Sequence, residues 1–194
     1  MTEAVRRPIG CKNVYIAEKT GLKTYATPKR LVGLEQFQYQ NQYNEFTAFS
    51  DDMMDTHEDK LKSINLTIQL RELAVALNAK IAGHTTTAGR LTQNVADKQP
   101  SFAVLVEETL SDGTSKLHVF YNVTLKREGQ SSTTQGENIS PSSVTLNGVA
   151  KPDEAGNLHH EVDTAEDGLD PTLVSGFFTE VVQPEYKKIP HVAG

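Results

Sequence analysis

The 194-residue sequence has one cysteine, no tryptophan and no long hydrophobic run. The single cysteine, Cys11, excludes an internal disulfide and is typical of a reducing compartment. No apolar stretch approaches the roughly 18 residues of a membrane-spanning helix. The first ten residues, MTEAVRRPIG, contain no apolar core of a secretory signal. We therefore expect a cytosolic product with no membrane partner.

Catalytic motifs are also missing. The sequence contains no glycine-rich phosphate loop, no GxSxG, no HExxH and no CxxC. His159, His160, Glu161 and Asp163 suggest a metal site at first sight, but neighbouring side chains of a strand point to opposite faces. We therefore expect no catalytic residue, no cofactor and no metal site.

A basic excess is absent too. The formal net charge is −6, and residues 153–186 contain acidic side chains but no Lys or Arg. This distribution lacks the basic footprint of a nucleic-acid-binding protein. The acidic tract is more typical of a solvated face.

The length and the pattern that remain predict one mainly β domain over 1–194, an antiparallel β-sandwich or barrel with one flanking helix and a second short C-terminal helix. The hydrophobic content of 37% fits thin β layers. Residues 43–60 break the alternation and predict a long hairpin tip or loop. The expected strands cover 14–19, 30–42, 61–70, 101–110, 116–127, 143–151 and 158–162, and the expected helices cover 71–82 and 171–183.

The clearest local signal is a hairpin. Ser111 to Ser115, with Asp112-Gly113 at its centre, separates two apolar runs. Strict alternation in the second run predicts that one face carries Leu117, Val119, Tyr121, Val123 and Leu125.

Two other strands have a polar face of unusual composition, with amides and hydroxyls but no charge. These faces comprise Gln36, Gln38 and Gln40 in one strand and Ser63, Asn65, Thr67 and Gln69 in the other. The alternate positions are apolar and predict a core-facing side, covered by the following helix. That side comprises Phe37, Tyr39, Ile64, Leu66, Ile68 and Leu70, beneath Leu73, Leu77 and Ile81.

The order of several segments resembles the major tail proteins (tail tube proteins) of long-tailed, non-contractile bacteriophages. The resemblance spans about residues 8–185. It is carried by IGCKNVYIAEKT (9–20), TYATPKRLVGLEQ (24–36), LTIQLRELAVALNAKIAGH (66–84), the 100–137 hairpin block with its TTQGE segment, and SGFFTEVV (175–182). Phe177 stands where the family would lead us to expect Trp, and the tail 186–194, which we expect to be flexible, is unmatched.

The resemblance implies a structural virion protein that forms hexameric rings, stacked into a hollow tube through which double-stranded DNA passes. It implies assembly in the host cytoplasm with further copies of itself, a tape measure protein, a tail terminator and distal tail proteins. A loop between early strands commonly helps rings to stack. Here that loop corresponds to the region containing Phe46, Phe49, Asp51, Asp52, Met53, Met54 and Asp55.

The physics of a DNA-conducting tube gives the uncharged faces a role. Each Lys or Arg in a lumen would bind phosphate with release of counterions. A polar wall without cations avoids this, so we expect the Gln36–Gln40 and Ser63–Gln69 rows to line the lumen. The alternative for these rows is an ordinary solvated sheet surface. The alternative functions for the protein are a tail terminator, the tube of a contractile injection system, a carbohydrate-binding β-sandwich and, most remotely, a small enzyme.

Overall fold

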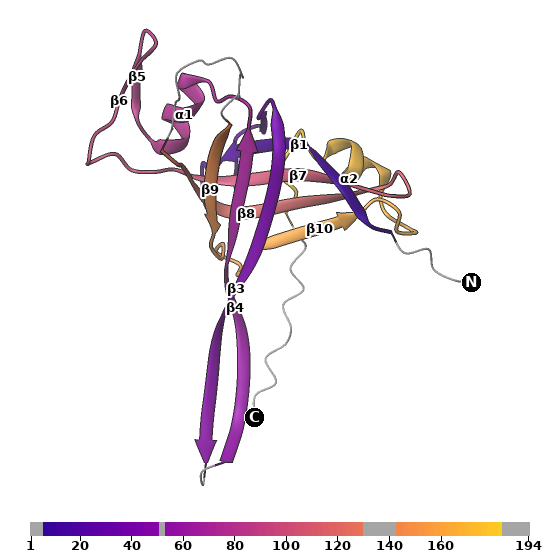
Figure 1. Cartoon of the computed structure of the whole chain (residues 1–194). Coiled ribbons are helices and arrows are strands. Elements are labelled where there is room, and N and C mark those ends of the chain that lie inside the picture. Colours follow the sequence, from indigo (N-terminus) through magenta and orange to yellow (C-terminus); the bar gives the residue numbers. More distant parts are fainter. Residues whose placement is uncertain (1–5, 51–52, 130–142, 184–194) are drawn as a thin grey trace, which may run out of the picture.

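The computed structural model describes residues 6–50, 53–129 and 143–183, and the side chains of 46–58 are outside that description. The described chain forms an eight-stranded antiparallel sheet, a small two-stranded sheet and two short helices (Figure 1). The predicted fold class, mainly antiparallel β with two short helices, is confirmed. Within the described residues, neither helix is long and apolar enough to cross a membrane.

The large sheet has the strand order β2-β1-β7-β8-β9-β4-β3, with β10 added beside β8. The first half of β8 pairs with β10, and its second half pairs with β9. The strands are β1 (Pro8–Glu18), β2 (Lys29–Arg30), β3 (Leu34–Ser50), β4 (Met53–Leu70), β7 (Ser101–Leu110), β8 (Ser115–Arg127), β9 (Val144–Ala150) and β10 (His159–Asp163). The small sheet pairs β5 (Thr85–Thr87) with β6 (Arg90–Thr92).

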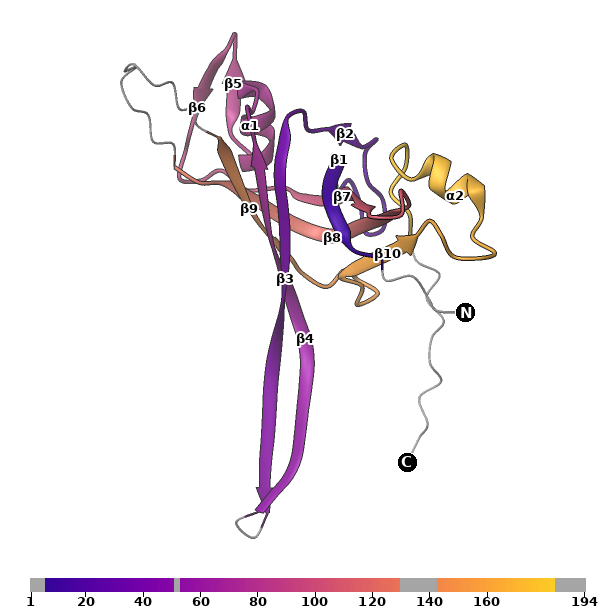
Figure 2. The ribbon, with the colours of Figure 1, turned by 45° about the vertical axis from the view of Figure 1, so that its right-hand side comes forward.

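The sheet folds over on itself and encloses the larger of two cores. Ile64, Leu66 and Ile68 of β4 belong to the same cluster as Val104 of β7 and Phe120 of β8. Strands from the two halves of the sheet therefore face each other across one apolar interior (Figure 2). Helix α1 (Val75–Ala82) covers it with Ile81, which is fully buried.

A second core lies on the other side of β7 and β8, beneath α2 (Pro171–Gly176). Leu117, Val119 and Tyr121 belong to it, whereas Val123 and Leu125 belong to the larger core. The prediction that all five share one face is therefore wrong.

The cause is Asn122, whose backbone is left-handed with φ 48°. A residue in this conformation interrupts the alternation of the strand, so the side chains on either side of it exchange faces. One strand thereby supplies side chains to both cores.

The predicted helices begin or end elsewhere. The 71–82 segment becomes helical only at Val75, because the Arg71 N–H donates to the carbonyl of Gly33 and keeps that residue against β3. The 171–183 helix begins as predicted at Pro171, with Asp170 accepting from the Thr172 N–H. It ends at Gly176, whose carbonyl accepts from the Thr179 hydroxyl at 2.7 Å.

Of the two alternatives predicted for 43–60, a long hairpin tip or a loop, the structure has the hairpin. Strands β3 and β4 stay paired from Tyr43 opposite Leu61 to Ser50 opposite Met53, with one shift of register between Ala48 and Phe49. The paired arms project well beyond the rest of the molecule (Figure 1). Three consecutive residues of β3 in this hairpin, Tyr43, Asn44 and Glu45, are exposed, so both faces of the strand meet solvent there and the sequence lacks the hydrophobic alternation of a half-buried strand.

Candidate assembly surfaces

The two uncharged polar rows predicted from the sequence lie side by side. Residues directly opposite in an antiparallel pair present their side chains on the same face. The register places Gln36 opposite Gln69, Gln38 opposite Thr67, Gln40 opposite Asn65 and Gln42 opposite Ser63. The structure thus joins both rows into one surface, the polar face, on β3 and β4.

The polar face continues onto β9. Thr145 lies opposite Gln69, and Asn147 lies opposite Thr67, which donates to its side-chain oxygen at 3.4 Å. On the next strand, however, Lys126 of β8 lies opposite Asn147 and is exposed. The uncharged region is therefore bounded by a cation on one side.

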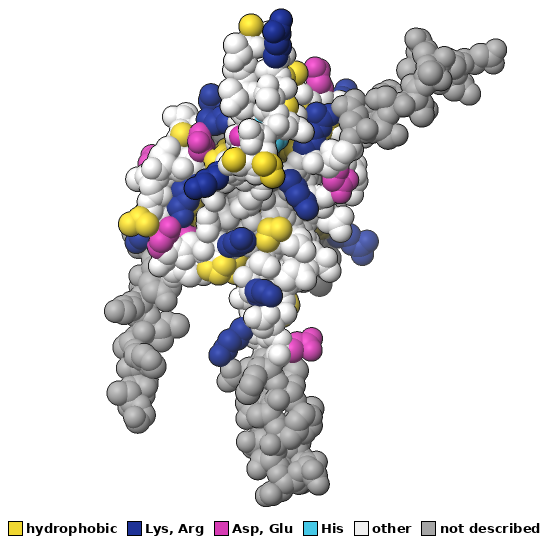
Figure 3. Space-filling model, turned by 90° about the vertical axis from the view of Figure 1, so that its left-hand side faces the viewer, with side chains coloured by type: hydrophobic (Ala, Val, Ile, Leu, Met, Phe, Trp, Pro, Cys, Tyr) yellow, Lys and Arg dark blue, Asp and Glu magenta, His cyan; other side chains and the backbone are white. Residues whose placement is uncertain are grey.

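Figure 3 shows the molecule from the side on which β9 lies in Figure 1. Among the described residues drawn there, Lys and Arg side chains are scattered over the surface, and some lie beside Asp or Glu side chains. They do not gather into a continuous basic patch.

The opposite side of these strands is the predicted core face. Ile64, Leu66, Ile68 and Leu70 are at most 1% exposed, and Phe37 packs against the same core. Tyr39 differs from the prediction, since 38% of it stays exposed. Its ring lies 5.3 Å from that of Phe120, so it contacts the body near the base of the hairpin.

Strand β3 forms one edge of the sheet. Within the part of the chain that the structure describes, it pairs only with β4. The opposite edge is β2, whose two residues cover only Tyr15 and Ile16 of β1. Both edges thus retain main-chain groups that can pair with another strand.

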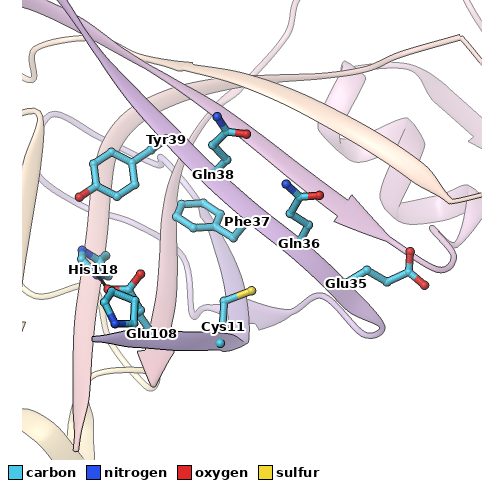
Figure 4. A pocket seen from close by; sticks show the side chains of 10 residues that line it. Cys11, Glu35, Gln36, Phe37, Gln38, Tyr39, Glu108 and His118 are labelled. Carbon is cyan, nitrogen blue, oxygen red and sulfur yellow. Dashed lines mark ion pairs between the residues drawn. The ribbon is translucent and has the colours of Figure 1, made fainter. Parts of the chain in front are cut away.

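A cavity of 490 Å³ separates the first part of β1 from β3. Figure 4 shows Phe37 and Tyr39 on the side of β3 that faces His118, with Gln36 and Gln38 on the other side. Cys11 comes from β1 across the cavity.

The residues predicted to support ring stacking lie on the distal part of the hairpin. Phe46 pairs with Glu58 and Phe49 with Met54 along the backbone. The side chains of Phe46, Phe49, Met53, Met54 and Asp55 are outside the described set, as are Asp51, Asp52 and the tail 186–194.

One cluster was missed by the sequence analysis. His159 and Glu161 of β10 share a face with His118 of β8, and the ligand atoms of all three lie within 4.8 Å of one another. His160 belongs to the alternate face, as predicted. The missing member was His118, whose place opposite Glu161 depends on pairing between distant segments.

Burial dominates the electrostatics of this histidine cluster. It lowers the pKa of His118, which is 3% exposed. Burial and the neighbouring His118 lower the pKa of His159 to about 4. Burial also raises the pKa of the Tyr39 hydroxyl beside them. The two imidazoles are therefore neutral near pH 7.

No protein-family model matches the sequence, and no curated protein does. Among solved structures, the chain is similar to the tube terminating cap of the anti-feeding prophage, determined by cryo-EM. The TM-score is 0.46 and the sequences are 8% identical, over 83% of this chain and 95% of that chain.

Proposed function

We propose that this protein is a structural subunit of a phage-like tail, and that its copies form a hexameric ring around a channel for double-stranded DNA. The observation that carries the proposal is the polar face, where two uncharged rows from separate strands meet in register. The sequence resemblance to tail tube proteins supports a role in a phage-like tail. The sheet, with its exposed edge strand, offers a way for subunits to join into a ring.

The composition of the polar face suits a DNA channel. Ring symmetry repeats every side chain around the lumen, so even one lysine per subunit would form a ring of phosphate-binding sites. Amides and hydroxyls keep the wall wet without attracting phosphate strongly. In this arrangement Gln36, Gln38, Gln40, Ser63, Asn65, Thr67 and Gln69 face the lumen.

Neighbouring subunits would join through the free edge of β3. A β-strand with unpaired main-chain groups can accept a strand of a neighbour, and such addition extends the sheet across the subunit boundary. A channel wide enough for duplex DNA needs more strands than one subunit supplies, because barrel diameter grows with strand number. Assembly is therefore the condition for the lumen to exist.

The projecting hairpin would carry contacts between rings. Its arms extend past the body, so its distal residues can reach a ring above or below. Phe46, Phe49, Asp51, Asp52, Met53, Met54 and Asp55 lie there in sequence. The tape measure protein, the terminator and the distal tail proteins are the further partners that this role implies.

Electron microscopy of the concentrated, purified protein tests the proposal. We expect hollow particles of uniform diameter. Long filaments would identify a tube subunit, and single rings would identify a terminator. A protein that stays monomeric at millimolar concentration, or forms only solid aggregates, would overturn the proposal.

A further inference from the structure

The histidine cluster between β8 and β10 offers a site for a different ligand. We propose that His118, His159 and Glu161 bind one divalent transition-metal ion of the zinc type. The proposal rests on the geometry of these three side chains and is independent of the proposed function.

The two distances from His118 to the other ligand atoms fit such an ion. His118 Nδ1 lies 3.1 Å from His159 Nε2 and 3.7 Å from Glu161 Oε2. Ligands about 2.0–2.1 Å from a tetrahedral zinc are about 3.3 Å apart. Two imidazole nitrogens and a carboxylate oxygen are a common set for catalytic or open zinc sites, which keep a position for water.

Metal binding requires that the hydrogen shared by the two imidazole rings move to another ring nitrogen. At 3.1 Å, one of these nitrogens carries a hydrogen and donates it to the other. Metal binding needs both lone pairs, so His118 must carry its hydrogen on Nε2 instead. Glu108 Oε2 lies 3.8 Å from that nitrogen, and Figure 4 shows the two side chains beside each other. A carboxylate behind a ligating histidine is the usual outer partner in metal sites.

The local charge also favours a cation. Glu161 and Glu108 are acidic, and the basic group beside them is Lys116. The Lys116 ammonium lies 2.6 Å from Glu161 Oε1, whereas it is the other oxygen, Oε2, that faces His118. The lysine therefore holds the carboxylate in place and leaves one oxygen for the metal.

The site is partly enclosed. His118 is buried, and the ring of His159 stacks 4.5 Å from that of Phe120. The Glu161 side chain is 35% exposed, so an ion can enter from solvent on that side. A bound ion would link β10 to β8 beside Tyr39 at the base of the hairpin.

Without metal, the same contacts form a neutral pair of stacked imidazoles, 5.3 Å apart at 12°. Titration of the tag-free protein with Co²⁺ separates the two cases, because tetrahedral Co²⁺ absorbs visible light far more strongly than the hydrated ion. We expect one equivalent to bind with strong absorption, and Zn²⁺ to displace it. His159→Gln and Glu161→Gln should each weaken binding at least tenfold.

His160→Gln is the matched control, because it removes the adjacent histidine from the alternate face of the same strand. This variant should bind Co²⁺ as the wild type does. Weak, octahedral-type absorption by the wild type would overturn the proposal, as would an equal loss of binding in the His160 variant.

Thermal unfolding provides a second readout. At Zn²⁺ a hundredfold above its dissociation constant, the wild type and His160→Gln should melt about 5–10 °C higher than without metal. The two ligand variants, checked for native circular dichroism, should show almost no shift. An equal shift in all four proteins would contradict the site.

Discussion

The carboxylate of Glu107 shows how one residue can link stability to pH. It accepts from Ser115 Oγ and Asn13 Nδ2, both at 2.7 Å, and lies 3.2 Å from Lys12 Nζ. Burial alone would raise the pKa of Glu107, but these hydrogen bonds outweigh burial and lower it below 4.5. Because the unfolded chain binds this proton more readily, the stabilisation is present above the ordinary pKa and is lost as the pH falls.

We therefore expect Glu107→Gln to lower the free energy of unfolding at pH 7 by about 1–2 kcal/mol. The variant should also lose less stability than the wild type between pH 5 and pH 3. Urea unfolding across this range measures both effects. Parallel pH profiles for the two proteins would contradict the assignment.

Gly83 ends helix α1 in a left-handed conformation with φ 74°. A methyl group placed there would meet the backbone carbonyl oxygen of Lys98 at 2.1 Å. Gly83→Ala should therefore destabilise the protein by about 2–4 kcal/mol, measured by urea unfolding.

Gly89 is the matched control for this substitution. Its φ is 78°, but nothing lies within 4 Å of an added Cβ. Gly89→Ala should cost only the conformational strain, about 1 kcal/mol. Equal costs at both positions would show that the Lys98 carbonyl moves away freely.

At the scale of an element, the bulge at Asn122 divides β8 between two cores. The Asn122 side chain donates to the carbonyl of Pro152 at 3.1 Å. A β-branched residue is unfavourable at positive φ, so Asn122→Val should cost about 2 kcal/mol or more, whereas Asn122→Gly should cost about 1 kcal/mol or less. Thr124→Val, two residues along the same strand, should be nearly neutral. Thermal unfolding of the three variants measures the difference, and a neutral Asn122→Val would refute the role of the bulge.

The same strand shows what sequence reasoning can and cannot reach. Alternation correctly predicted the 101–127 hairpin and the apolar face of 64–70, because those patterns are local. The bulge at Asn122 could not be predicted from the sequence, since asparagine is also common in regular turns and loops. The sequence left 43–60 open between a hairpin tip and a loop, because residues exposed on both faces, such as Tyr43, Asn44 and Glu45, show no alternation that would identify a strand.

The sequence did not predict the histidine cluster, for a further reason. Its two members on β10 were visible at a spacing of two residues, but the third comes from a strand about 40 residues earlier. Only the register of Glu161 opposite His118 brings them together. By contrast, the polar rows on β3 and β4 could be predicted, because each is an alternating pattern within a single strand.

At the scale of the whole molecule, the polar face predicts how assemblies treat DNA. Gln38 and Asn65 are exposed on neighbouring rows of that face. The double variant Gln38→Lys plus Asn65→Lys should fold and assemble normally, because both side chains lie outside the core. Its rings or tubes should retain duplex DNA at low salt and release it as salt rises, whereas wild-type assemblies should retain little. Gel filtration with labelled duplex measures the retention.

The salt dependence decides between a lumen and an ordinary solvated surface. Each phosphate that the new lysines neutralise should steepen the plot of log affinity against log salt by about 0.9. Thr172→Lys plus Ser175→Lys adds the same charge at exposed positions of α2, which covers the second core on the other side of β7 and β8, and should not produce this slope. Lys126→Gln, which removes the cation bordering the face, should reduce whatever DNA the wild-type assembly retains. If the two double variants bind DNA equally, the added charge acts only through the outer surface, and the polar face does not line a channel.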